Sequence, residues 1–251
     1  MLSDDALLQA AEVVNRNEIR RAYKTFRWQN DGLPAAWNVR KEMEVNTQQW
    51  LASKRADGGR ALATAVHKWG FGKISLPRSC RVGQWEGTFY QVMRAWHLKD
   101  GVTSAPTANQ LVELLAGDRV GIATVSKWIC FIDQERYAIY DSRVSRALRT
   151  VQVGGARLFP IVPGRVATGK WARGDLLGSD ADARHQAVRA YVQYLRLVRM
   201  LGMEVGLIAG QVEMALFMLG KELPSTSERR LPFARHLYTS GRIEPHTCAS
   251  A

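Results

Sequence analysis

The chain has 251 residues, of which 46% are hydrophobic, so it can bury a sizeable core and its composition excludes wholesale disorder. Lys and Arg number 35 against 23 Asp and Glu, and this formal charge of +12 favours a polyanionic partner, either nucleic acid or an acidic membrane surface. No run approaches the roughly 20 apolar residues of a membrane span, and the acidic start lacks the features of a signal peptide, so we expect a cytoplasmic protein.

The cysteines and histidines argue against a metal centre. Cys80, Cys130 and Cys248 are far apart and form no Cys-x-x-Cys pair, and the five histidines are scattered. Zinc sites and iron–sulfur clusters need closely grouped ligands. We therefore predict reduced thiols, no metal and no structural cluster.

Helical spacing of apolar residues dominates the first half of the chain. It predicts a first helix with Ser3 as its cap, then helices over 37–51, 61–69 and about 85–98, and one around Leu111 to Leu115. Gly70-Phe-Gly72 follows the segment 61–69. Because glycine is common just after a helix, we expect this helix to end there.

Beyond residue 148 the pattern loosens before two further helices. Glycines and prolines over 151–171 predict a long irregular segment, with a short extended piece at 158–162. A helix begins near Ala181, and a second apolar helix over 212–219 is closed by Gly220. The residues from 223 to 251 form a polar, basic tail. The prediction is a mainly α fold with few or no strands, in a single domain over 1–251.

The most informative stretch runs from Gly121 to Leu148. Ile122, Val125 and Ile129 share one helix face, and neighbouring apolar residues occupy the other faces, which is typical of a buried helix. Gly121 allows a tight turn before this helix. The first amides of the helix are then free to bind a phosphate.

Asp141 opens the next predicted helix. Arg143, Arg146 and Arg149 follow at intervals of three and form a basic stripe on it. On these residues alone, the commoner use of Asp141 is to cap the helix, with solvated arginines behind it.

Two segments of this stretch resemble the helix-hairpin-helix DNA glycosylases. That family carries Leu-Pro-Gly-Val-Gly-x-x-Thr-Ala, an apolar helix, and then Val-Asp-Thr-His-Val; the counterparts here are Val120-Gly-Ile-Ala-Thr-Val-Ser126 and Tyr140-Asp-Ser-Arg-Val144. The chain is most similar to divergent bacterial members with the 8-oxoguanine glycosylase fold. The similarity covers about 110–148 and, more loosely, the last helices. It implies two packed helical lobes with an active cleft between them, and a hairpin plus catalytic segment over 110–150.

The resemblance assigns catalysis to Asp141. Bifunctional members place a lysine four residues after the first hairpin glycine, where this chain has Val125. Lys127 lies two residues later, about 200° around the helix, so we expect it on the opposite face and regard it as a poor substitute nucleophile. The prediction is a monofunctional glycosylase in which a carboxylate stabilises charge on the sugar or orients water. We expect no cofactor, although the resemblance allows a monovalent cation bound by the hairpin.

The remaining site residues follow from the same resemblance. The predicted DNA contacts are Gly121, Ala123, Thr124, Val125, Ser126, Arg143, Arg146 and Lys170. The base must leave the stack, so a pocket is needed. Its candidates are Tyr137 and Tyr140, and Gln211 and Glu213 on the last helix, with core packing for the tyrosines and an exposed helix face for the other two as alternatives. We expect a monomer that acts on DNA, on a hypermodified phage base in defence or a damaged base in repair.

Three other interpretations stay open. Residues 111–128 can be a helix-turn-helix, although a recognition helix presents polar side chains to the groove and this one continues into Trp-Ile-Cys-Phe-Ile. Gly164-Arg-Val-Ala-Thr-Gly-Lys170 matches a nucleotide-binding loop, but Trp171 stands where the magnesium-binding Ser or Thr belongs. The third interpretation is an inactive relative that binds DNA without cutting the base from its sugar.

Overall fold

The computed structural model describes residues 4–28, 31–72, 76, 80, 85–118, 120–149, 151–153, 156–160, 162 and 181–222. These residues form ten α-helices and two short hairpins, which confirms the predicted mainly α class. The helices are α1 (Asp4–Val13), α2 (Arg16–Lys24), α3 (Leu33–Ala52), α4 (Gly59–Phe71), α5 (Trp85–Leu98), α6 (Ala105–Asp118), α7 (Ile122–Cys130), α8 (Ser142–Leu148), α9 (Ala181–Val205) and α10 (Ala209–Glu222).

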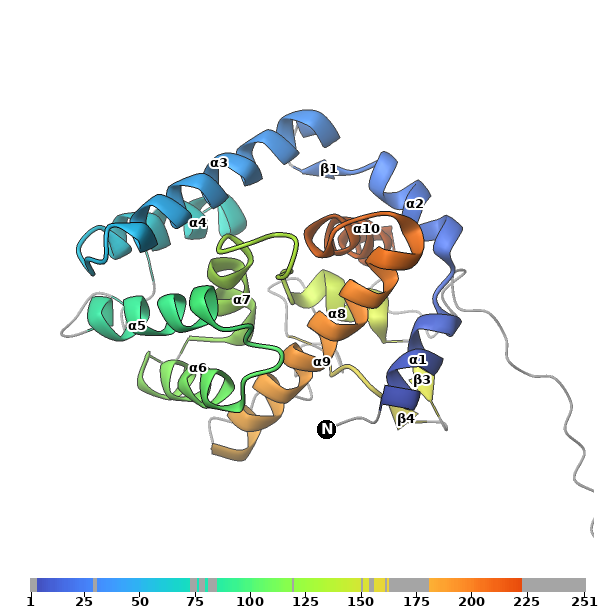
Figure 1. The fold of residues 1–251 in the computed structure, drawn as a ribbon. Coiled ribbons are helices and arrows are strands. Elements are labelled where there is room, and N and C mark those ends of the chain that lie inside the picture. Colours follow the sequence, from blue (N-terminus) through green and yellow to red (C-terminus); the bar gives the residue numbers. More distant parts are fainter. Residues whose placement is uncertain are drawn as a thin grey trace, which may run out of the picture.

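The first and last helices of the chain lie together. α10 packs on α2 and α8, and α9 packs on α1, as the right-hand half of Figure 1 shows. α3, α4, α5 and α6 form the other half, and α7 lies between the two groups, in contact with α4, α5 and α9. The candidate site segment, α7 through α8, is therefore held by elements from both ends of the sequence.

Most predicted helices are confirmed, with two differences. α10 continues through Gly220 to Glu222, so that glycine does not end it. α2 was missed because it is strongly basic and buries only Ile19 and Ala22; its start is fixed by Asn15, whose side chain accepts from the amides of Asn17 and Glu18. A short helix with two buried residues leaves too weak an apolar period to detect.

Strands are few. β1 (Arg27–Trp28) pairs with β2 (Asp31–Gly32), and β3 (Gln152–Val153) pairs with β4 (Ala156–Arg157), both antiparallel. The extended piece expected at 158–162 is not a strand in its described residues, 158–160 and 162. The basic tail, Lys170 and the 164–170 loop lie outside the described residues.

No single helix in the described ranges is long and apolar enough to cross a bilayer. α9 and α10 pass the test of length and composition as a pair, but they meet at an angle of 98°.

Candidate active site

Asp141 caps α8, as the local sequence favours. Its Oδ1 accepts hydrogen bonds from the amides of Arg143 (2.9 Å) and Val144 (3.1 Å), and its backbone is extended. These bonds fix one carboxylate oxygen on the helix and leave Oδ2 for another partner. The side chain is 16% exposed, so it lies at the edge of the core rather than inside it.

The other partner of Asp141 is Lys127, a contact that the sequence did not predict. Nζ of Lys127 lies 3.5 Å from Oδ2 of Asp141 and donates to the carbonyl of Ala123 at 3.2 Å. Lys127 does lie opposite Val125 on α7, but Val125 points into the core and Lys127 points toward the carboxylate. The residue regarded as a poor substitute nucleophile is the one that the fold brings to Asp141.

Ser126 holds the loop that precedes α8 against α7. Ser126 is fully buried, and its Oγ accepts from the amide of Tyr140 at 3.0 Å, directly before Asp141. The loop between α7 and α8 is thereby held against α7. The side chains of Val125 and Ser126 are buried, so a DNA contact from either residue would have to be made by its backbone amide. The Val125 amide already donates to the carbonyl of Gly121 at 3.3 Å.

The turn before α7 also differs from the expectation. Gly121 has φ −75° and ψ 156°, an extended conformation that any residue adopts, and no side chain caps the helix. Gly121 is exposed, and Ala123 and Thr124 are partly exposed, so this end of α7 is open to a ligand. It stays a predicted phosphate contact.

The predicted basic stripe on α8 does not form as a set. Arg149 is 5% exposed, whereas Arg143 and Arg146 are half-buried. The Arg143 guanidinium lies 4.5 Å from the ring centre of Phe217 and 5.8 Å from that of Trp28. Stacking on rings leaves the edges of a guanidinium free to bind phosphate, so Arg143 remains a candidate DNA contact.

The two tyrosines proposed for a base pocket belong to the core. Tyr137 and Tyr140 are fully buried, and their hydroxyls donate to the carbonyls of Trp96 and Pro160. Burial raises the pKa of both hydroxyls. The alternative of core packing therefore describes them in this structure, and neither offers a surface to a flipped base.

Glu213 is not on an exposed face, contrary to the alternative given for it. Its Oε2 lies 2.6 Å from Nη2 of Arg40, and both side chains are at most 3% exposed. Burial raises the pKa of Glu213, and the Arg40 guanidinium opposes this rise. Gln211 is half-buried and donates to the hydroxyl of Tyr23 at 2.8 Å.

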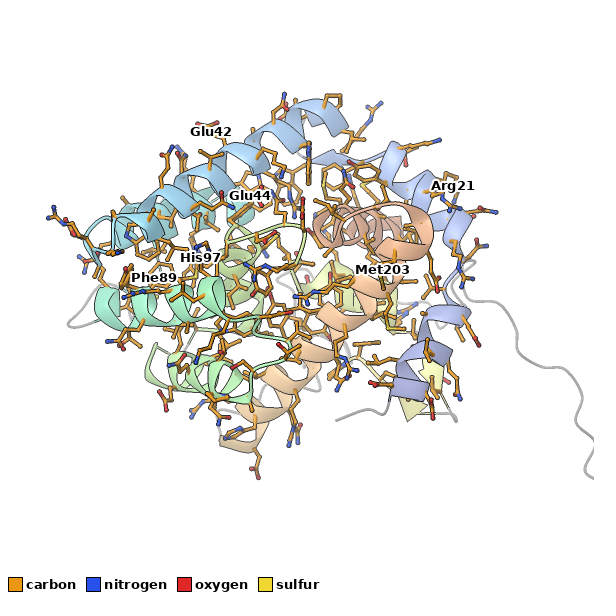
Figure 2. All side chains as sticks on the ribbon, in the orientation of Figure 1. Arg21, Glu42, Glu44, Phe89, His97 and Met203 are labelled. Atoms are coloured by element: carbon orange, nitrogen blue, oxygen red, sulfur yellow. The ribbon has the colours of Figure 1, made fainter. Side chains whose placement is uncertain are left out.

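Arg40 is the centre of a polar network that the sequence did not reveal. Its Nε donates to Oε1 of Gln134 (2.7 Å), and the backbone N–H of Gln134 donates to Oε1 of Glu44 (2.7 Å). Figure 2 shows Glu44 on the inner side of α3 and Glu42 on the outer side. Cys130 also contacts Arg40, and burial raises the pKa of this thiol to about 12, which excludes it as a nucleophile near neutral pH.

The remaining open alternatives can be weighed against this geometry. Residues 125–130 of α7 are buried, so α7 cannot enter a DNA groove as a recognition helix without leaving the core. Within the described part of the chain, no group of three or more His, Cys, Asp or Glu side chains could hold a metal ion.

Asp141 lies in a segment of a buried helix, a loop and a second helix within a mainly α fold, which is the arrangement that the resemblance to helix-hairpin-helix glycosylases implies. Residues 28–217 match a family described as "Putative 8-oxoguanine DNA glycosylase OGG-like protein". Because the match covers most of the chain, the protein belongs to this OGG-like family. No curated protein and no solved structure matched the chain.

Proposed function

We propose that the protein is a DNA glycosylase that removes a modified base through the Lys127–Asp141 pair. The observation that carries this proposal is the 3.5 Å approach of a nearly buried amine to a carboxylate at the edge of the core. An amine and a carboxylate in contact supply a nucleophile and a group that can take its proton. The family membership supports DNA as the substrate.

In the proposed reaction, the neutral amine of Lys127 attacks C1′ of the flipped nucleotide. The electrons of the N-glycosidic bond leave with the base, which takes up a proton. Opening of the sugar then gives an imine between Lys127 and C1′. Asp141 has Oδ2 free of the helix cap, so it can take the proton that the Lys127 amine loses and pass it to the departing base. The restored carboxylate then faces the positive charge that develops on the sugar.

A second version of the step keeps Asp141 as the sole catalytic group, as the sequence predicted. The observation in its favour is that Lys127 is only 5% exposed and already donates to Ala123. In this monofunctional version, water attacks C1′, and the Lys127 ammonium orients the carboxylate. No imine forms, and the DNA strand is cut only after alkali.

One experiment separates these versions. Purified protein is incubated with duplexes that each carry one oxidised, alkylated or hypermodified base, and the strands are examined for breaks with and without alkali. Parallel samples contain borohydride, which traps an imine as a covalent adduct. An adduct that is lost in Lys127→Met supports the first version; alkali-dependent breaks without an adduct support the second.

The controls are exposed residues of the same type. Lys99→Met and Asp57→Asn change side chains on the surface, away from the pair. Both variants should retain the activity of the unmodified protein. If no substrate is cut, or if Asp141→Asn keeps full activity, the proposed function is wrong.

A further inference from the structure

Gly70 has no conformational reason to be a glycine. It lies in the last turn of α4, before the left-handed cap at Gly72, and its own φ is not positive. Glycine is less favourable than alanine inside a helix, because its backbone loses more freedom on folding. The presence of glycine here is therefore best explained by what occupies the space beside it.

The side chain of Lys127 occupies that space. A Cβ added at Gly70 would lie 2.6 Å from Cδ and 2.8 Å from Cε of Lys127, closer than real Cβ contacts. Any other residue at this position would force the aliphatic part of Lys127 to move. The path of the lysine to Asp141 thus runs through the volume that the missing side chain leaves.

Phe71, the next residue, covers the end of the same side chain. Its ring centre lies 4.5 Å from Nζ of Lys127, within the range of a cation–π contact. The ring is itself held by His67, at 4.7 Å between ring centres. One residue of α4 therefore leaves room for the lysine chain, and the next attracts its charged end.

This turn of α4 is anchored to α7. Trp69 packs edge-on against Phe131 at 5.3 Å, directly after the last turn of α7. The distance between Gly70 and Lys127 is consequently set by packing between two helices rather than by a mobile loop. A rigid surface beside the Lys127 side chain holds its amine in one orientation, as attack on a reacting atom requires.

From this arrangement we infer that Gly70 and Phe71 are positioning residues, which guide the Lys127 amine to Asp141. The inference rests on the proposed function, since it assigns to α4 the placement of the group that the reaction uses. Neither residue contacts Asp141 in the contacts described above. Their effect on the reaction passes through Lys127.

Gly70→Ala is the principal test, with Gly87→Ala as its matched control. Both substitutions add one methyl group to a helix, but a Cβ at Gly87 meets nothing within 4 Å. We expect Gly70→Ala to lower the single-turnover rate at saturating DNA on the order of 10- to 100-fold, with the dissociation constant for DNA nearly unchanged. Gly87→Ala should change neither quantity. Because the clash is with a flexible side chain, Gly70→Ala should remain folded.

A double-mutant cycle then asks whether the effect passes through the lysine. In a Lys127→Met background, Gly70→Ala should lower the residual rate by less than about twofold, because the displaced group is absent. An equal loss in both backgrounds would show a general structural role and overturn the inference. Phe71→Leu keeps the apolar cover but removes the aromatic face, and we expect a several-fold loss of rate that also disappears in the Lys127→Met background.

A measurement without DNA separates this inference from the proposed function. In protein labelled with 13C-lysine, the Cε–Hε signal of Lys127, assigned by its loss in Lys127→Met, should be displaced by the ring current of Phe71. The displacement should vanish in Phe71→Leu, change in Gly70→Ala and persist in Gly87→Ala. This result would support the positioning role of Gly70 and Phe71 even if no base is excised. An unchanged signal in both α4 variants would overturn the inference even in an active enzyme.

Discussion

Two ion pairs, Arg40–Glu213 and Lys127–Asp141, lie near one another but differ in length and in exposure to solvent. The Arg40 pair is short, at 2.6 Å, and at most 3% exposed, and the guanidinium has a further bond to Gln134. In the Lys127 pair the atoms are 3.5 Å apart and the carboxylate is 16% exposed. The two pairs interact electrostatically, since both Asp141 and Lys127 influence the pKa of Glu213.

This difference separates a structural pair from a reactive one. Arg40 joins α3 to α10, and its contacts with Glu213, Gln134 and Cys130 all lie within the core. The charged atoms of Lys127 and Asp141 are farther apart, and the Asp141 side chain is 16% exposed. A group that exchanges protons with a substrate must be reachable from outside the core. A charge that holds two helices together is best kept inside the core, in close contact with its partner.

The largest effect should come from Asp141→Asn, and it should fall on activity alone. Asparagine is as good a helix cap as aspartate, so the two amide bonds to α8 can be retained. The loss of the charged oxygen beside Lys127 should lower the excision rate by about 10² to 10⁴-fold. Stability, measured by urea unfolding, should change by less than about 1 kcal/mol. If Asp141→Asn is destabilised but fully active, the Lys127–Asp141 pair is structural and not reactive.

Arg40→Met should show the converse pattern, a large loss of stability. Removing one partner of a buried pair leaves an uncompensated charge, and the expected cost is about 3–5 kcal/mol near neutral pH. Urea unfolding gives this value directly. Arg40→Met/Glu213→Leu removes both charges and should recover much of the loss. If Arg40→Met is as stable as the unmodified protein, the pair is not the structural element we infer.

The loss of stability in Arg40→Met should depend on pH. Burial raises the pKa of Glu213, so the folded state holds the proton more tightly than the unfolded state. Ionisation of Glu213 therefore costs stability as pH rises from the ordinary value of 4.5 through the folded pKa, and the cost is absent below that window. Without Arg40 the folded pKa should rise further. The destabilisation of Arg40→Met should accordingly be smaller at acidic pH than at neutral pH.

The two pairs also show what the sequence could and could not predict. The period of α7 correctly placed Val125 and Lys127 on opposite faces. The contact between Lys127 and Asp141 was not predicted, because a helical period says nothing about the direction in which the chain returns after a loop. That direction is set by contacts such as Ser126 to Tyr140.

The Arg40–Glu213 pair could not be predicted from the sequence for a related reason. A lone acid on an apolar helix suggests an exposed position, and its partner lies in α3, near the other end of the chain. Long-range pairing of charges leaves no local period. By contrast, most of the helices, the buried character of α7 and the cap at Asp141 depend on neighbours in sequence, and these were predicted correctly.

Gly220→Ala tests the element that connects the two regions, with a smaller expected effect. A Cβ at Gly220 would lie 1.9 Å from the carbonyl oxygen of Arg143, so α10 and the start of α8 would have to separate. Since the obstacle is backbone, we expect a loss of about 1–3 kcal/mol. Activity should fall too, because Asp141 caps the displaced end of α8. Gly87→Ala is again the control, and equal behaviour of the two variants would contradict the close approach.

The smallest effect should come from Asp100→Asn, which breaks a third pair of intermediate exposure. Asp100 accepts two hydrogen bonds from Arg199, at 2.7 and 2.9 Å, but both side chains are about a quarter exposed. The hydrogen bonds from Arg199 lower the pKa of Asp100, so its contribution is present above the ordinary value of 3.8 and is lost as pH falls through the folded pKa. We expect a cost of about 1 kcal/mol or less at pH 7, none below this window, and no change in excision rate. A loss as large as that of Arg40→Met would show that burial is not what distinguishes the structural pair.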